Sequence, residues 1–141
     1  MALTVRDIMN PQLLYVTEGD PCDVVRDKLV RFGVSGAPVL DRSYRPVGFV
    51  SLRDITGDGS TVQAMRPAAT TRDDEPVESA ARALANADLR HFVVVDSAGT
   101  AVGVVSALDF VRALSGLPPR HPPRFDVDCS SAEAYPDNID G

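Results

Sequence analysis

The sequence predicts an α+β fold in which two copies of one strand-helix-strand-strand-helix unit pack sheet to sheet in a single pseudo-twofold globule, followed by a Pro-rich acidic tail. Three observations lead to this prediction. The sequence repeats itself at an interval of 55 residues, the apolar period changes in the same order in each copy, and the predicted strands are almost entirely apolar. A strand without polar alternation is covered on both faces, so we expect the two sheets to cover each other.

The repeat is clearest in GFVSLRDI (residues 48–55) and GVVSALDF (residues 103–110). Both segments place Gly, two apolar residues, Ser, two variable residues, Asp and an apolar residue in the same order. The shift of 55 also places Pro21 on Pro76 without a gap. Because such a long match indicates duplication, we divide the chain into a first repeat (residues 1–58), a second repeat (residues 59–116) and a tail (residues 117–141).

The helices and strands of the first repeat are predicted from changes in the spacing of its apolar residues. A short strand precedes Asp20, which we expect to cap a helix with Pro21 as its first residue and Gly33 as its end. Two apolar segments joined by DRSYR predict a β-hairpin, and a closing helix is expected to begin near Ser51 and to stop at the glycines that follow. The predicted ranges are strand 14–16, helix 21–32, strands 37–40 and 46–50, and a closing helix up to residue 56.

The second repeat shows the same order of patterns. PVESAARALANA has helical apolar spacing, FVVV and AVGVV are strand-like, and DSAG between them predicts a turn. ALDFVRAL predicts the closing helix. A third match, between IMNP (residues 8–11) and AMRP (residues 64–67), has an offset of 56, so one residue is gained or lost between the copies.

Composition excludes several classes of protein. The 14 basic and 20 acidic residues give a formal net charge of −6, which disfavours a broad contact with nucleic acid or an anionic membrane. No apolar run approaches the roughly 18 residues of a membrane span, and the start of the chain lacks the apolar core of a signal peptide. Two separated cysteines are no disulfide framework. We therefore expect a soluble cytoplasmic protein, and the abundance of Arg over Lys suggests a bacterial source.

The tail differs from the repeats in composition. It contains five prolines, two basic and five acidic residues in residues 117–141, without an apolar period. One interpretation is a flexible extension. The other is a segment that docks on a partner or a second subunit through Phe125, Val127 and Tyr135.

The repeated Ser and Asp have two interpretations. Ser-x-x-Asp before an apolar run is typical of a helix cap, in which the acid reaches back to the backbone. The alternative is a binding site, because a glycine three residues earlier would let a ligand approach the strand, and a carboxylate can accept two hydrogen bonds from the vicinal diol of a ribose. Residue types alone leave both interpretations open.

The duplicated unit resembles a tandem pair of CBS domains (cystathionine-β-synthase domains), also called a Bateman module. The resemblance is carried by GAPVLDRSYRPVGFVSLRD and RHFVVVDSAGTAVGVVSALD and covers about residues 3–116. It implies one globule with two related clefts that bind an adenosine-type ligand, such as AMP, ADP, ATP or S-adenosylmethionine, as a regulatory ligand rather than a required cofactor. It also implies that two modules associate into a homodimer.

Residue by residue, the resemblance implies a first cleft with Asp54 on the ribose hydroxyls and Ser51 on ribose or phosphate. Thr17, Ala37 and Pro38 would border the adenine, largely through backbone groups.

The resemblance also implies that the phosphate of the first cleft is held by the basic pair Arg90 and His91, from the opposite repeat. An Arg suits a bidentate phosphate contact, and a His contributes most when protonated. The alternatives are an ordinary exposed Arg and a half-buried His at a strand edge.

In the second cleft the matching residues are Asp109 and Ser106, with Thr71, Phe92 and Val93 along the adenine wall. Val93 replaces the Pro usual in the family, and the positions that correspond to Arg90 and His91, which are Ser35 and Gly36, carry no charge. We therefore expect this cleft to bind more weakly, or to take an uncharged ligand.

Two classes of function remain. The first is a standalone ligand sensor in which an adenosine nucleotide changes the surface offered to a second subunit or to an effector protein. The second is a scaffold whose clefts bind no ligand and whose dimer surface and tail recognise a partner. Catalysis is not expected, because the chain has two histidines, no phosphate-binding Gly-rich loop and no carboxylate with an evident proton-transfer partner. No metal site is expected either.

Overall fold

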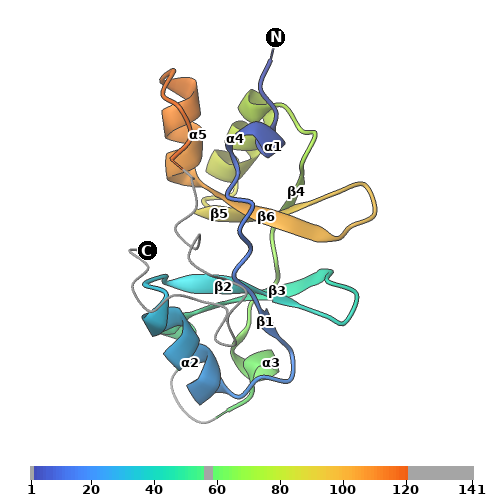
Figure 1. Cartoon of the computed structure of the whole chain (residues 1–141), viewed down its shortest axis with the longest axis vertical. Helices are drawn as coiled ribbons and strands as arrows, with labels where there is room; N and C mark the ends of the chain where they lie inside the picture. Colours follow the sequence, from blue (N-terminus) through green and yellow to red (C-terminus); the bar gives the residue numbers. More distant parts are fainter. Residues whose placement is uncertain (1, 56–58, 121–141) are drawn as a thin grey trace.

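The computed structural model describes residues 2–55 and 59–120. It contains two three-stranded sheets that face each other across the middle of the molecule, with helices on the outer side of each sheet (Figure 1). The predicted α+β fold with two repeats packed sheet to sheet is therefore confirmed. In chain order the elements are α1 (Val5–Ile8), β1 (Val16–Thr17), α2 (Cys22–Arg31), β2 (Gly36–Leu40), β3 (Pro46–Ser51), the one-turn 3-10 helix η1 (Leu52–Asp54), α3 (Thr61–Ala64), β4 (Thr70–Arg72), α4 (Val77–Asn86), β5 (His91–Val95), β6 (Ala101–Ser106) and α5 (Ala107–Leu114).

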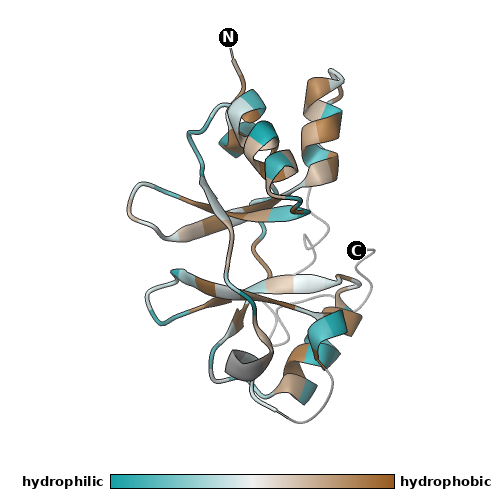
Figure 2. Cartoon of the chain, turned by 180° about the vertical axis from the view of Figure 1, so that it is seen from behind, coloured by the Kyte–Doolittle hydropathy of each residue, from teal (hydrophilic) through white to brown (hydrophobic). Residues whose placement is uncertain are grey.

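The two sheets have the same topology. In each, the first strand pairs parallel with the second, and the second pairs antiparallel with the third. Alternate residues of each strand face either the helices or the opposite sheet. Between the sheets, Leu40, Val93 and Ala101 form a buried cluster. The strands in Figure 2 contain brown, apolar stretches that agree with this double burial, alongside white and teal ones.

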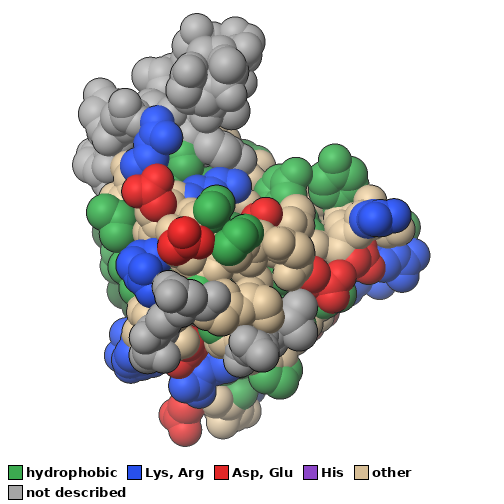
Figure 3. Space-filling view, turned by 90° about the horizontal axis from the view of Figure 1, so that it is seen from below, with side chains coloured by type: hydrophobic (Ala, Val, Ile, Leu, Met, Phe, Trp, Pro, Cys, Tyr) green, Lys and Arg blue, Asp and Glu red, His purple; other side chains and the backbone are tan. Residues whose placement is uncertain are grey.

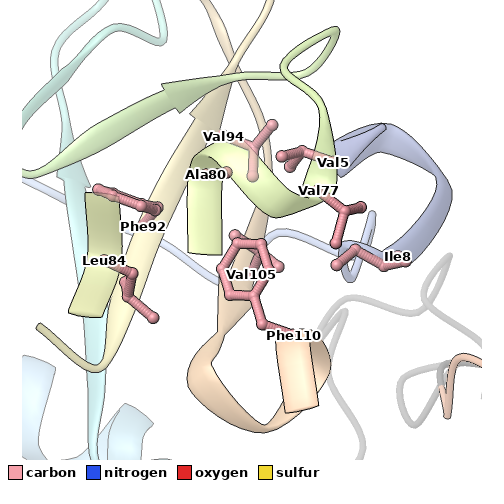
Figure 4. Close-up of a cluster of buried hydrophobic side chains, with 9 residues drawn as sticks. All are labelled: Val5, Ile8, Val77, Ala80, Leu84, Phe92, Val94, Val105 and Phe110. Atoms are coloured by element: carbon pink, nitrogen blue, oxygen red, sulfur yellow. The ribbon is translucent and has the colours of Figure 1, made fainter. Parts of the chain in front are cut away.

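The chain before β1 packs on the second repeat rather than the first. We call residues 2–12 the first leader. Val5 of α1 donates its N–H to the Glu75 carbonyl over 2.9 Å, and Val77 donates to the Leu3 carbonyl over 3.1 Å. Val5 and Ile8 are members of the core of the second repeat, where Figure 4 shows them beside Val77. This core is therefore completed by the first leader.

The segment before β4 makes the reciprocal exchange. We call residues 59–69 the second leader. Its Gly59 carbonyl accepts from Cys22 over 3.1 Å, and Arg66 exchanges two backbone hydrogen bonds of 2.8 Å with Phe49. Met65 packs against the core of the first repeat. The match between IMNP and AMRP thus marks the two places where a leader crosses the opposite sheet.

The repeated glycines lie under these crossings. A Cβ at Gly103 would be 2.6 Å from the Asn10 carbonyl oxygen and 2.8 Å from Met9 Sδ. At Gly48 it would be 2.5 Å from Met65 Sδ and 2.9 Å from the Arg66 carbonyl oxygen. The leaders fill the space beside these two glycines, so the expectation that a ligand approaches the strand there is wrong.

The predicted closing helix of the first repeat is wrong. After Ser51 the chain makes only the single 3-10 turn η1, and Ile55 is extended, with φ −95° and ψ 101°. The Ser51 side chain makes no hydrogen bond to the backbone of η1, so the turn lacks the cap that holds α5. Residues 56–58, which include Gly57, lie outside the described residues.

Helix α2 begins one residue later than predicted, with Pro21 as its N-cap. Asp20 does not cap it, because its Oδ2 accepts the Thr17 N–H over 2.9 Å and closes the preceding turn. Its end agrees with the prediction. Gly33 has φ 64°, and Val34 donates back to the Leu29 carbonyl over 3.0 Å, as in a Schellman motif.

The close contacts over the glycines predict that Gly103→Ala destabilises the protein by about 1–3 kcal/mol, because the new methyl group meets backbone that cannot move without separating the leader from β6. Gly48→Ala should have a similar effect. Gly19→Ala is the matched control, since nothing lies within 4 Å of its Cβ position. Urea unfolding of the three variants measures the difference, and equal midpoints would contradict the assigned role of the glycines.

Candidate functional site

Two neighbouring cavities lie between the repeats, and each contains the Asp of one Ser-x-x-Asp motif. The Asp54 cavity has a volume of about 550 Å³, and the Asp109 cavity has a volume of about 360 Å³. Both volumes lie within the range of small-molecule sites. Ser35, Phe49 and His91 border both cavities and therefore form a shared wall.

The Asp54 carboxylate is held by two neighbours. Arg66 donates from Nε to Oδ2 and from Nη2 to Oδ1, each over 2.9 Å, and the Ser51 hydroxyl donates to Oδ2 over 2.9 Å. The hydrogen bond from Arg66, followed by that from Ser51, lowers the pKa of Asp54 below its ordinary value. Asp54 is therefore ionised at neutral pH and faces a cavity that is also bordered by Arg53 and Arg90.

The Asp109 carboxylate has a different environment. Its Oδ2 accepts the Ser106 N–H over 2.8 Å, and the Ser106 hydroxyl accepts the Asp109 N–H over 3.2 Å. This reciprocal pair is a capping box at the start of α5. One motif, used twice, thus caps a helix in the second repeat and supports an ion pair in the first.

His91 lies at the start of β5 and stacks on Phe49, with ring centroids 5.7 Å apart and an interplanar angle of 19°. Burial lowers the pKa of His91, the Asp109 carboxylate opposes this shift, and Arg90 adds to it. The imidazole is therefore neutral at pH 7, and its interaction with a phosphate would be a hydrogen bond rather than an ion pair.

Six of the predicted site residues border a cavity in the predicted grouping. Ser51, Asp54, Arg90 and His91 come together around the Asp54 cavity, and Ser106 and Asp109 border the other. Their roles toward a ligand stay predictions.

The residues predicted along the adenine walls are placed differently. Pro38 borders the Asp109 cavity rather than the Asp54 cavity. Strand alternation explains this, because Gly36 and Pro38 face the opposite sheet while Ala37 is buried toward α2. Five predicted wall residues border neither cavity: Thr17, Ala37, Thr71, Phe92 and Val93.

The sequence interpretation missed the contribution of the leaders. Arg66 borders the Asp54 cavity, and Asn10, at the equivalent place in the first leader, borders the Asp109 cavity. Arg120 gives the Asp109 cavity a positive charge, although Ser35 and Gly36, at the positions equivalent to Arg90 and His91, carry none. The IMNP and AMRP match contained the signal for the leaders, and nothing in the repeat pattern pointed to Arg120.

Comparison with known proteins decides the family. The family model described as "CBS domain" matches residues 5–57 and residues 61–116. The chain belongs to the CBS domain family. It carries two CBS domains in tandem, as the sequence resemblance predicted, and the two matches together span both sheets.

Solved CBS-pair structures share the fold. CBSX2 in complex with AMP is 30% identical, with a TM-score of 0.74, over 81% of this chain and 97% of that one. CBSX2 from Arabidopsis thaliana is 28% identical, with a TM-score of 0.75, over 82% of this chain and 96% of that one.

Among curated proteins, a zinc metalloprotease of Methanocaldococcus jannaschii is 29% identical over 82% of this chain and 33% of its own length. A homoserine O-acetyltransferase of Methanosphaerula palustris is 31% identical over 82% of this chain and 24% of its own length. This CBS pair thus spans about a quarter to a third of these relatives.

Two further features of the described residues, 2–55 and 59–120, bear on the site. No helix in these ranges has the length and apolarity to cross a membrane. Nor do these ranges hold a group of three His, Cys, Asp or Glu residues arranged to bind a metal ion. Phe125, Val127 and Tyr135, which one interpretation of the tail makes docking residues, lie outside the described residues.

The environment of His91 predicts a pH dependence of stability. Because its pKa in the folded protein lies below the unfolded value of about 6.5, the unfolded state binds more protons in the interval between the two values. The stability from the neutral imidazole is therefore present above about pH 6.5 and is lost as the pH falls through the lowered value. His91→Gln should reduce the decrease in unfolding temperature between pH 7.5 and 5.5.

His121→Gln is the control for loss of one histidine. Thermal unfolding at steps of pH measures both variants and the parent protein. The interpretation is wrong if the pH profile of His91→Gln follows that of the parent.

Proposed function

We propose that this CBS pair is a regulatory, non-catalytic module that binds an adenosine-type nucleotide in the Asp54 cavity. The observation that carries the proposal is the convergence there of an ionised carboxylate, which suits a ribose diol, with Arg53, Arg66 and Arg90, which suit phosphate. The 30% identical CBSX2 structure, which is a complex with AMP, supports the same class of ligand.

The Asp54 cavity is proposed as the stronger site. It is the larger of the two and has three arginines on its border, whereas the Asp109 carboxylate already accepts a backbone hydrogen bond as a helix cap. Arg120 supplies some positive charge to the Asp109 cavity, so that cavity is proposed as a weaker site, open to a nucleoside or to a nucleotide.

The distribution of surface charge favours a small ligand over nucleic acid. On the face shown in Figure 3, basic and acidic side chains are interspersed with apolar ones. This face therefore offers no extended positive field along which a phosphate backbone could lie.

The signal is proposed to be a change in the relative position of the two repeats. Each cavity is bordered by residues of both repeats, so a ligand there contacts both at once. Such a ligand shifts the equilibrium between two arrangements only if it binds them with different affinity. The altered surface would then be read by a second copy of the chain or by an effector protein.

An exposed apolar row on α5 supports the proposed homodimer. Leu108, Val111 and Leu114 are 51–57% exposed and are spaced three residues apart, and Leu117 follows with 49% exposure. Apolar residues at this spacing share one side of a helix. A second copy of the chain would cover this row in a two-fold contact.

A scaffold that binds no nucleotide is the second candidate. It is favoured by the fact that both Asp carboxylates already have partners within the chain, Arg66 in one case and the Ser106 N–H in the other. In this case the α5 row would be the functional surface, and the cavities would only be gaps between the repeats.

Nucleotide binding separates the two candidates. AMP, ADP, ATP or S-adenosylmethionine at 100 times its dissociation constant should stabilise the protein by about 2.7 kcal/mol in a thermal-shift assay. In calorimetry, Asp54→Ala should abolish binding at the stronger site, whereas Asp109→Ala should leave it. The opposite result would reverse the ranking of the cavities, and no shift with any of these ligands or NADH would favour the scaffold.

The α5 row predicts a change of oligomeric state. Val111→Asp places a charge in the row and should convert a dimer to a monomer, because a two-fold contact would bury two such charges, one from each copy. Ala98→Asp adds the same charge in the exposed turn between β5 and β6 and should leave the dimer intact. Light scattering measures the mass of each, and a parent protein that is monomeric at high concentration would refute the dimer.

A further inference from the structure

We infer that Arg66 acts as an exchangeable partner of Asp54, so that the Asp54 cavity selects phosphorylated nucleotides against the corresponding nucleosides. A ligand diol displaces the guanidinium from the carboxylate, and the guanidinium then binds the ligand phosphate. The inference rests on the proposed function and adds to it the origin of the ligand specificity.

The ion pair occupies the atoms that a ribose needs. Arg66 contacts both oxygens of Asp54 at 2.9 Å, and Oδ2 also accepts the Ser51 hydroxyl. A vicinal diol donates its two hydrogen bonds to the same carboxylate oxygens, in the same two-point manner as a guanidinium. The two groups therefore compete, and a bound ribose requires the guanidinium to leave or to share its acceptors.

Arg66 can move without disturbing the fold. Its backbone is fixed by two hydrogen bonds of 2.8 Å to Phe49, while its side chain is 69% exposed. The Asp54 side chain is only 15% exposed. The carboxylate is thus a fixed point in the wall, and the guanidinium is held over it by a long, solvated stem with many rotamers.

The released guanidinium stays beside the ligand. Arg66 borders the same cavity as Arg90, from the second repeat, and Arg53, from the first, so a phosphate in that cavity lies among basic groups from both repeats. A nucleotide offers the guanidinium a second anion in exchange for Asp54. A nucleoside offers it none, and must break the ion pair without a replacement.

The Asp109 cavity provides an internal comparison. The leader residue equivalent to Arg66 is Asn10, and its Oδ1 accepts the Gln12 N–H over 3.0 Å. An amide of this kind carries no charge to exchange. The two cavities therefore differ at this leader position: the Asp54 cavity has a charged guanidinium that can exchange partners, and the Asp109 cavity has a neutral amide.

The test is Arg66→Asn, which gives the second leader the residue found in the first. Calorimetry of the full chain with AMP and with adenosine measures the two affinities. We expect AMP to bind about tenfold more weakly, because a charge-assisted contact is lost, and adenosine to bind about threefold more tightly, because no ion pair has to be broken.

Arg90→Ala is the matched control, since it removes a basic group of the same cavity that has no part in the Asp54 pair. It should weaken AMP binding and leave adenosine binding unchanged. A rise in adenosine affinity is therefore the result that identifies exchange, as opposed to loss of positive charge.

The outcomes separate the inference from the proposed function. If the parent binds AMP and Asp54→Ala abolishes it, but Arg66→Asn does not strengthen adenosine binding, the exchange is refuted and the nucleotide site stands. If neither ligand binds the parent or Arg66→Asn, both are refuted. Adenosine binding that appears only in Arg66→Asn supports the exchange.

Discussion

The structure depends on the reciprocal crossing of the two leaders. Each leader runs over the third strand of the opposite sheet, at a glycine that cannot accept a Cβ without moving backbone. This crossing places α1 in the core of the second repeat and Met65 against the core of the first. It also places Asn10 and Arg66 at the borders of the cavities. The packing of both cores and the walls of both cavities therefore depend on the same contact.

The two halves are related by sequence but are not chemically equivalent. Ser106 and Asp109 stabilise a helix of eight residues, whereas Ser51 precedes and Asp54 ends a single 3-10 turn. Because η1 lacks the backbone cap, Asp54 turns its carboxylate to Arg66. The first repeat thus has an ion pair where the second has a helix cap, and the two cavities differ in their electrostatics.

Sequence reasoning predicted the longer strands, the longer helices and the family, because duplication and apolar period are properties of the chain itself. The first strand was expected at residues 14–16 and lies at Val16–Thr17. It failed where a residue's role depends on contacts across the repeats. Gly103 seemed to leave room for a ligand, yet it makes room for Met9. Ala37 and Pro38 were assigned to one wall, although neighbours in a strand face opposite sides. Arg66 and Arg120 lie outside the Ser-x-x-Asp motifs, and their place at the cavities depends on the fold.

The exchange of leaders also constrains how the chain folds during translation. Residues 3–6 pair with residues 73–77, so during translation the first leader emerges from the ribosome long before its docking surface exists. Contacts of such sequence separation form late and slow the folding of a small domain. The nascent first repeat must meanwhile leave its own third strand open for a leader that has not been synthesised, and neither repeat, expressed by itself, would possess a closed core.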